Sequence, residues 1–132
     1  MRLAYIGGSF DPPHFGHINL IRRVLDLGFE PIIAVNSNKF IESYKHRPAY
    51  MDESERCNYF EDLGYNTIIV NQNMQRYTIE DLCIDVIVVG TDWLRPEILT
   101  QLGIDETFLI DNEINFLIVP RTPNVSSSEL RK

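Results

Sequence analysis

The chain has 132 residues and a mass of 15.3 kDa, the size of one domain with a core of its own. Its 19 acidic and 12 basic residues give a net charge of −7, which argues against a duplex nucleic-acid binder and a basic membrane-surface protein. Cys57 and Cys83 form no disulfide framework and no four-ligand metal pattern, so we expect a reducing, cytoplasmic location. No apolar run approaches the ~20 residues of a membrane span, and Gly7-Gly8 interrupt an apolar start too short for a signal peptide.

Short apolar runs alternate along the chain with segments of helical spacing. The runs are mostly rich in β-branched residues, typical of buried parallel strands, and cover Leu3–Ile6, Ile32–Val35, Thr67–Val70, Val86–Val89 and Phe116–Val119. Helices are predicted at Phe15–Leu27, Asp52–Leu63 and Gln75–Leu82, within Pro96–Leu102, and from Ser126 onward. This order predicts a Rossmann-like α/β fold, a doubly wound five-stranded parallel sheet in a single domain. Ligands bind such sheets at the carboxyl ends of the strands, so the loops there hold the candidate site.

The first of these loops reads GGSFDPPHFGH. Gly7-Gly8 allow a sharp turn and a close approach of the backbone to a ligand, and Asp11-Pro12-Pro13 stiffen the loop. His14 and His17 are three residues apart where a helix begins, a spacing that can place both imidazoles on one side. Gly16 leaves a gap between them, and the helix N-terminus favours phosphate. The loop lacks the spacing of a Walker loop or a GxGxxG fingerprint.

This loop resembles the signature of the HxGH nucleotidyltransferases, with His14-Phe15-Gly16-His17 as the HxGH residues. Over essentially its whole length the chain is similar to the small cytidylyltransferases. The resemblance implies transfer of a nucleoside monophosphate from a nucleoside triphosphate to an acceptor phosphate, with release of pyrophosphate. It implies that His14 and His17 are catalytic. It also implies nucleotide contacts from the remaining residues of the loop, namely Gly8, Ser9, Phe10, Asp11 and Gly16.

The second loop, expected over Asn38–Tyr50, carries the local cationic cluster Lys45-His46-Arg47. A solvated turn is the simpler interpretation of such a cluster, but beside a phosphate site Lys45 and Arg47 become candidate phosphate clamps. The resemblance implies a catalytic and acceptor-binding role for Lys45 and a nucleotide contact for Arg47. Arg56 resembles the family's nucleotide-site arginine on the following helix; the alternative is an intrahelical pair with Asp52.

The fourth strand ends in a sequence that resembles the family's GxDW loop, which helps to form the nucleotide pocket. Gly90, Asp92 and Trp93 are the residues concerned. Trp93 packing over the sheet edge and Asp92 capping the next helix are compatible alternatives. The resemblance also places Arg76 near the position of a family lysine that binds the acceptor phosphate.

The fifth strand leads into PRTPNVSSSELRK, whose hydroxyls and helix N-terminus suit a phosphate cradle. The segment is similar to the family's RTxxxST motif, which binds the triphosphate. The resemblance implies that Arg121 is catalytic and that Thr122, Ser126, Ser127 and Ser128 bind the nucleotide. A polar helix cap is the alternative for the serines.

The implied reaction transfers CMP from CTP to a small phosphomonoester similar to glycerol 3-phosphate. Such an acceptor is a dianion at neutral pH and needs no strong general base, so positioning and electrostatic stabilisation carry the chemistry. Mg²⁺ is expected as the cofactor, held mainly by the triphosphate and with no dedicated protein ligands; Asp11 is its nearest candidate neighbour.

Three other functions stay open. An adenylyltransferase of the phosphopantetheine type would use ATP, but that type usually has threonine in place of His14 and a longer chain. A nucleotide-sensing module without turnover would not need both histidines. A nucleic-acid binder on the same fold is disfavoured by the acidic balance.

The stretch Leu94–Asn115 is longer than in the family's type member and carries exposed-looking apolar side chains: Leu99, Leu102, Ile104, Phe108, Leu109 and Ile110. They need cover from an added helix folded back on the domain or from a second subunit. Because close relatives pair, we expect a homodimer.

Overall fold

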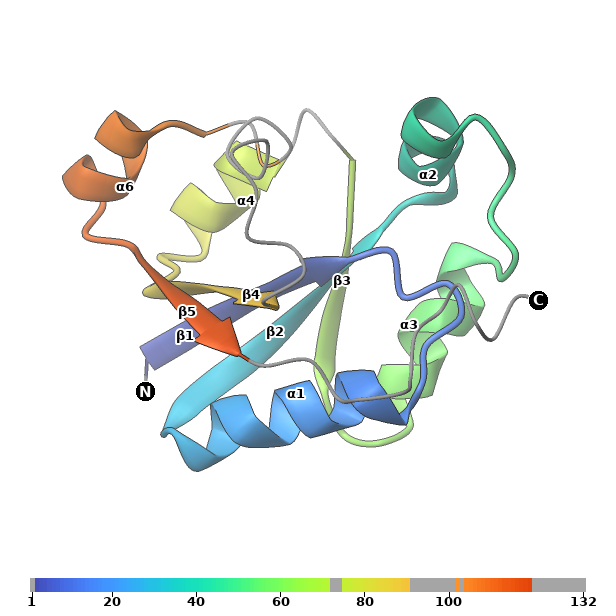
Figure 1. Ribbon diagram of the computed structural model, residues 1–132, viewed down its shortest axis with the longest axis horizontal. Coiled ribbons are helices and arrows are strands. Elements are labelled where there is room, and N and C mark those ends of the chain that lie inside the picture. The colour runs from blue at the N-terminus through green and yellow to red at the C-terminus, as the bar shows by residue number, and fades with distance from the viewer. Residues whose placement is uncertain (1, 72–74, 91–101, 103, 120–132) are drawn as a thin grey trace.

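Five parallel strands form one sheet in the computed structural model, which describes residues 2–71, 75–90, 102 and 104–119 (Figure 1). The order across the sheet is β3-β2-β1-β4-β5, so the chain winds outward in both directions from β1. The strands are β1 Arg2–Gly8, β2 Phe29–Asn36, β3 Asn66–Val70, β4 Val86–Gly90 and β5 Asn115–Val119. This confirms the doubly wound parallel sheet predicted from the sequence.

Helices connect the strands and cover both faces of the sheet. They are α1 Phe15–Asp26, α2 Asn38–Lys45, α3 Glu53–Glu61, α4 Gln75–Asp81 and α6 Glu106–Asp111. In Figure 1, α1 and α3 lie on one side of the sheet and α4 and α6 on the other. Successive side chains of a strand point to opposite faces, so each strand contributes to two cores.

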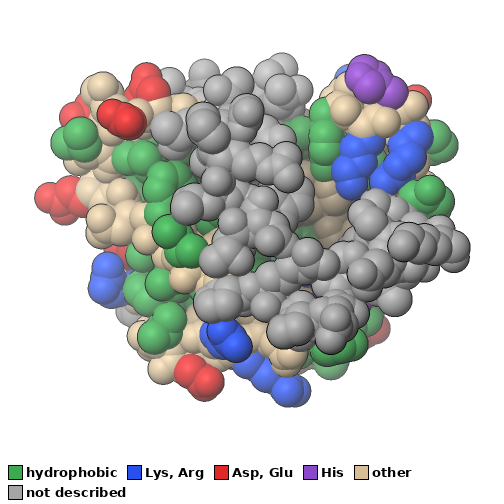
Figure 2. Space-filling model, in the orientation of Figure 1, with side chains coloured by type: hydrophobic (Ala, Val, Ile, Leu, Met, Phe, Trp, Pro, Cys, Tyr) green, Lys and Arg blue, Asp and Glu red, His purple; other side chains and the backbone are tan. Residues whose placement is uncertain are grey.

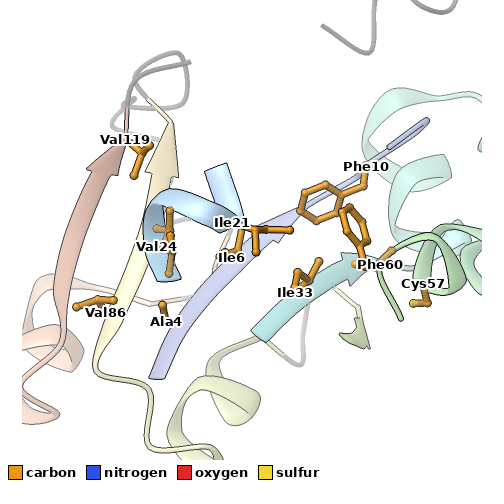
Figure 3. Close-up of a cluster of buried hydrophobic side chains, with 12 residues drawn as sticks. Ala4, Ile6, Phe10, Ile21, Val24, Ile33, Cys57, Phe60, Val86 and Val119 are labelled. Carbon is orange, nitrogen blue, oxygen red and sulfur yellow. The ribbon is translucent and has the colours of Figure 1, made fainter. Parts of the chain in front are cut away.

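A hydrophobic core packs α1 and α3 against one face of the sheet (Figure 3). In it Ile21 and Val24 of α1 and Phe60 of α3 pack against the side chains of β1, β2, β4 and β5. On the opposite face, Ile79 of α4 and Phe108 of α6 pack against Tyr5, Ile87 and other side chains of the sheet. The two cores make the strand ends a rigid base for the loops.

One expected loop is a helix. Asn38–Lys45 forms α2, capped by Ser37, whose hydroxyl accepts a hydrogen bond from the backbone N–H of Phe40 at 3.0 Å. Phe40 and Ile41 are buried under this helix. The prediction of a loop was wrong because eight residues with two adjacent apolar side chains show too little helical periodicity. The helix forms because the serine cap and the burial of its apolar side chains stabilise it.

The apolar stretch before β5 is covered by the domain itself. Leu102, Ile104 and Phe108 are buried in the core on the α6 side, and Leu109 packs against it. Asp105 caps α6 by accepting a hydrogen bond from the backbone N–H of Phe108 at 2.8 Å. Of the six apolar residues, Ile110 is 75% exposed and Leu99 lies outside the described residues. Of the two kinds of cover expected for these side chains, the helix folded back on the domain is therefore the one that the structure shows for the buried residues, and the dimer stays a prediction.

The remaining predicted helices fall outside the described residues except for Leu102, which is helical. Residues 96–101 and the segment from Ser126 lie outside the described residues. Within the described ranges, no helix combines the length and the apolar character that a membrane crossing requires.

Candidate active site

The candidate site lies at the carboxyl end of β1, where the strand order reverses. β1 pairs with β2 on one side and with β4 on the other, so its C-terminal loop opens at the topological switch point of the sheet. This loop runs from Ser9 to His14 and leads directly into α1. The fold thus brings the motif that the sequence singles out to the place where such sheets bind ligands.

His14 and His17 form a stacked pair at the start of α1. Their ring centroids are 3.7 Å apart and the ring planes differ by 24°. His14 is the N-cap of the helix, and its Nδ1 accepts a hydrogen bond from the backbone N–H of Gly16 at 3.1 Å. The Nδ1 of His17 accepts one from the backbone N–H of His14, also at 3.1 Å. The expected placement of both imidazoles on one side of the helix is confirmed.

These two hydrogen bonds fix the protonation of the rings. A neutral imidazole carries one N–H donor and one acceptor nitrogen, so a ring that accepts at Nδ1 carries its hydrogen on Nε2. Burial, and after it the charge of His14, lowers the pKa of His17 to about 3. The pair therefore offers neutral Nε2–H donors, which can bind oxygen atoms of a phosphoryl group.

Phe10 supports the histidine pair from the core side. Phe10 is 6% exposed, and its ring makes an edge-to-face contact with His17, at 4.8 Å between centroids. It makes a second edge-to-face contact with Phe60, at 5.1 Å (Figure 3). Gly8 leaves room for this ring, since a Cβ there would come within 3.2 Å of it. The ring is enclosed by the protein, so the nucleotide contact expected of Phe10 is left to its backbone and stays a prediction.

Asp11 shapes the loop from inside. Its carboxylate is fully buried and accepts hydrogen bonds from the backbone N–H groups of Tyr50, at 2.9 Å, and Met51, at 2.8 Å. Arg47 Nη1 lies 3.6 Å from the same carboxylate. Both carboxylate oxygens therefore have protein partners, and they join the first loop to the segment that follows α2.

The basic cluster lies at and just beyond the C-terminal end of α2. Figure 2 shows Lys and Arg side chains gathered on the surface over this helix. Lys45 Nζ lies 5.6 Å from the centroid of the Tyr44 ring, and the Arg47 guanidinium lies 4.4 Å from that of Tyr50. Arg47 also donates to the carbonyl oxygen of Pro48, whereas its buried Nη2 has no hydrogen-bond partner among the described residues. An anion is the natural partner for that group.

Arg56 departs from the role that we expected. Its side chain is fully buried in α3, and its guanidinium donates hydrogen bonds to four oxygen atoms of the protein. Its hydrogen bonds go to the protein, so this geometry gives no support to the expected nucleotide contact, which stays a prediction. The alternative of a pair with Asp52 is not what the structure has either, because Asp52 instead accepts from Asn38 and Ser54.

Several expected site residues cannot be placed. Gly90 ends β4, and Arg76 belongs to α4. Those that lie outside the described residues are Asp92, Trp93, Arg121, Thr122, Ser126, Ser127 and Ser128. Their roles stay predictions.

Polar contacts that the sequence analysis missed attach α2 to the site. The hydroxyl of Tyr44 hydrogen-bonds that of Ser9, which also accepts from the side-chain amide of Asn36 at 3.4 Å. At the other end of α2, the backbone N–H of Asn38 donates to the Glu53 carboxylate at 2.8 Å. The partners in these contacts are too far apart in the chain for any spacing rule to connect them. The sequence signal that could have indicated α2 is a serine cap followed by Phe40, Ile41 and Tyr44.

The carboxylate of the histidine loop is already engaged by protein partners. Among the described residues, no three His, Cys, Asp or Glu side chains group as a metal site. Asp11, the carboxylate nearest the histidines in sequence, is committed to Tyr50, Met51 and Arg47. Hard cations such as Mg²⁺ commonly bind nucleotide phosphates and water with few protein ligands.

Comparison with known proteins agrees with this fold. The family model described as "Cytidylyltransferase-like" matches residues 5–132. Two glycerol-3-phosphate cytidylyltransferases align with the whole chain: that of Staphylococcus aureus is 24% identical over 94% of its length, and that of Bacillus subtilis is 28% identical over 96%. The crystal structure of a lipopolysaccharide core biosynthesis protein from Thermoplasma volcanium has the same fold, with a TM-score of 0.71, 21% identity, and 92% of this chain and 97% of that one covered.

The histidine pair and the basic cluster lie where parallel sheets of this topology bind ligands, and the family match and the relatives along the whole chain make the protein a nucleotidyltransferase. The chain belongs to the cytidylyltransferase-like family.

Proposed function

We propose that this protein transfers CMP from CTP to a small phosphomonoester of the glycerol 3-phosphate kind and releases pyrophosphate. The single observation that carries the proposal is the stacked pair of His14 and His17, both accepting at Nδ1, at the carboxyl end of β1. The likeness to two glycerol-3-phosphate cytidylyltransferases along the whole chain supports CTP and this class of acceptor.

In the proposed reaction an oxygen of the acceptor phosphate attacks the α-phosphorus of CTP. A new P–O bond forms there, the bond from the α-phosphorus to the bridging oxygen breaks, and pyrophosphate leaves with that electron pair. The acceptor is already a dianion near neutral pH, because its second pKa is about 6. The barrier therefore comes from bringing anions together and from charge that grows on the α-phosphoryl and bridging oxygens.

The protein lowers this barrier by placing donors before the reaction starts. The Nε2–H groups of His14 and His17 donate to the α-phosphoryl and bridging oxygens as charge develops. Lys45 and Arg47 bind phosphate oxygens from the α2 side. Arg121, Ser126, Ser127 and Ser128 are proposed to hold the triphosphate, and Arg76 the acceptor phosphate. Mg²⁺ bound to the triphosphate would neutralise part of its charge.

A grid of pyrophosphate-release assays tests the proposal. The four nucleoside triphosphates are each combined with a panel of small phosphomonoesters. Release that requires both CTP and a phosphomonoester is the expected result. Release with ATP and phosphopantetheine would instead establish the adenylyltransferase alternative. Nucleotide binding without release under any combination would establish the sensing module.

Two properties of the protein complete the proposal. We propose a cytoplasmic enzyme, which is in keeping with the free thiols of Cys57 and Cys83. We also propose a homodimer, which rests on the family resemblance, since α6 removes most of the argument from uncovered apolar residues. A mass near 15 kDa by light scattering, independent of concentration, would exclude the dimer.

A further inference from the structure

Arg56 is the largest side chain that the described residues bury completely. Its guanidinium donates four hydrogen bonds. Nη1 donates to the carbonyl oxygens of Ser9, at 2.7 Å, and Asn36, at 2.6 Å. Nη2 donates to the side-chain oxygen of Asn38 at 2.8 Å, and Nε to the carbonyl oxygen of Met51 at 2.9 Å. Few groups other than a guanidinium could satisfy so many acceptors from one position.

The four acceptors belong to separate parts of the site. Ser9 begins the loop that carries the histidine pair, and Asn36 ends β2. Asn38 is the first residue of α2, the helix that has Lys45 at its other end, and Met51 precedes α3. One planar, rigid group thus sets the distance between the loop after β1 and the segments on either side of α2.

A second buried group completes the connection. Asp11 accepts the backbone N–H of Met51, while Arg56 binds the carbonyl oxygen of the same residue. Burial lowers the pKa of Arg56, but the nearby Asp11 and Glu53 carboxylates raise it, and an arginine in a protein stays charged. The positive charge of Arg56 therefore offsets the negative charge of Asp11. It also offsets the partial negative charges of the carbonyl oxygens that point at the guanidinium.

We infer that Arg56 is a positioning residue of the transferase reaction: it touches no substrate, and it holds the histidine loop and α2 so that His14, His17 and Lys45 act on one phosphate chain. This inference rests on the proposed function for its kinetic readout. It replaces the nucleotide contact expected from the sequence with a structural connection between two ligand-binding segments.

The test compares Arg56→Lys with Arg22→Lys. Lysine keeps the charge at position 56 but has a point-like ammonium with three donors, so it cannot reach all four acceptors. Arg22 is exposed on α1 and controls for the substitution itself. In pyrophosphate-release assays we expect Arg56→Lys to lower kcat at least ~10-fold with a smaller change in the KM for CTP, because misplaced histidines weaken transition-state contacts most. Arg22→Lys should match the wild type.

Two kinetic results would overturn the inference. Unchanged kcat in a folded Arg56→Lys protein would show that the connection does not position the reacting groups. A higher KM for CTP at unchanged kcat would show that Arg56 binds the nucleotide directly. If Arg56→Lys does not fold, Asn38→Ala takes its place, since it removes one acceptor and leaves Arg56 three. A several-fold loss of kcat is then expected, and wild-type turnover would reject the inference.

A readout without turnover separates this inference from the proposed function. Nitrogen-15 spectra of the histidine rings report whether Nδ1 of His14 and His17 still accepts a hydrogen bond. We expect these signals to shift or broaden in Arg56→Lys and to stay unchanged in Arg22→Lys. Spectra identical to the wild type in both variants would reject the positioning role, even for a protein that releases no pyrophosphate. If the spectra of Arg56→Lys are altered and the wild-type protein releases no pyrophosphate, the positioning role stands and the proposed reaction is rejected.

Discussion

The imidazole of His17 lies against that of His14, 3.7 Å from it, and accepts its hydrogen bond from the backbone N–H of His14. The two rings are therefore held by the first turn of α1 and by each other. Phe10 makes an edge-to-face contact with His17 and limits its movement further. Donors fixed in this way need no reorganisation when a phosphoryl group arrives, which is the arrangement that lowers a barrier most effectively.

Replacing His17 tests this arrangement directly. We expect His17→Ala to lower kcat and kcat/KM equally, by at least ~10²-fold, because it removes a donor used in the transition state. Loss of the contact to the backbone of His14 should cost about 1 kcal/mol of stability, as for other helix caps, and leave the protein folded. His46→Asn is the matched control, since His46 is exposed and asparagine tolerates its φ of 57°. Near-normal turnover in folded His17→Ala would reject the histidine pair as the catalytic centre.

The stability of the protein should fall on acidification because of His17. In the unfolded chain this residue takes up a proton as the pH falls through about 6.5, whereas in the folded protein its pKa is about 3. Between these values the unfolded state binds more protons, so the free energy of unfolding decreases as the pH decreases.

Denaturant unfolding at pH 7, 6, 5 and 4 measures the effect. His17 contributes up to about a tenfold change in the unfolding constant per pH unit within that window. The His17→Gln variant should lack this contribution, and His46→Asn should keep it. Parallel curves for wild type and His17→Gln would contradict the burial-induced shift.

The pH dependence of turnover should follow the acceptor rather than the histidine. His17 stays neutral down to a pH of about 3, whereas the acceptor phosphate loses its second negative charge near pH 6. We therefore expect kcat/KM to decline below about pH 6, and the midpoint to move when acceptors of different second pKa are compared. A midpoint that is the same for all acceptors would assign the titration to the enzyme.

The cover that α6 gives to the sheet can be tested with two apolar residues of one helix. Phe108 is 4% exposed and Ile110 is 75% exposed. Phe108→Ala should lower the free energy of unfolding by roughly 3–5 kcal/mol, and Ile110→Ala should change it by less than about 0.5 kcal/mol. Light scattering should give both variants the wild-type mass. A loss of mass in Phe108→Ala would place that residue in a subunit contact instead.

The sequence alone determined the class of fold and the position of the histidine pair. The strands of such a sheet are short continuous apolar runs, most of them rich in β-branched residues, and all five strands show this local signal. The spacing of His14 and His17 before an apolar helix is local too, and one turn of helix suffices to bring the rings together. Patterns of this kind depend only on residues within one strand or one helix, so they can be recognised without knowing the tertiary structure.

Only the tertiary structure decided what the distant polar residues do. Arg56 was expected to bind the nucleotide and is instead enclosed by carbonyl oxygens from three other segments. Phe10 was expected at the ligand and packs on Phe60, and the apolar residues around Phe108 turned out to be covered by their own domain. The residue type of a cation, an aromatic ring or an apolar side chain does not by itself distinguish a core position from a binding site. Which surface it faces depends on contacts between segments tens of residues apart, and these exist only once the sheet and its helices have assembled.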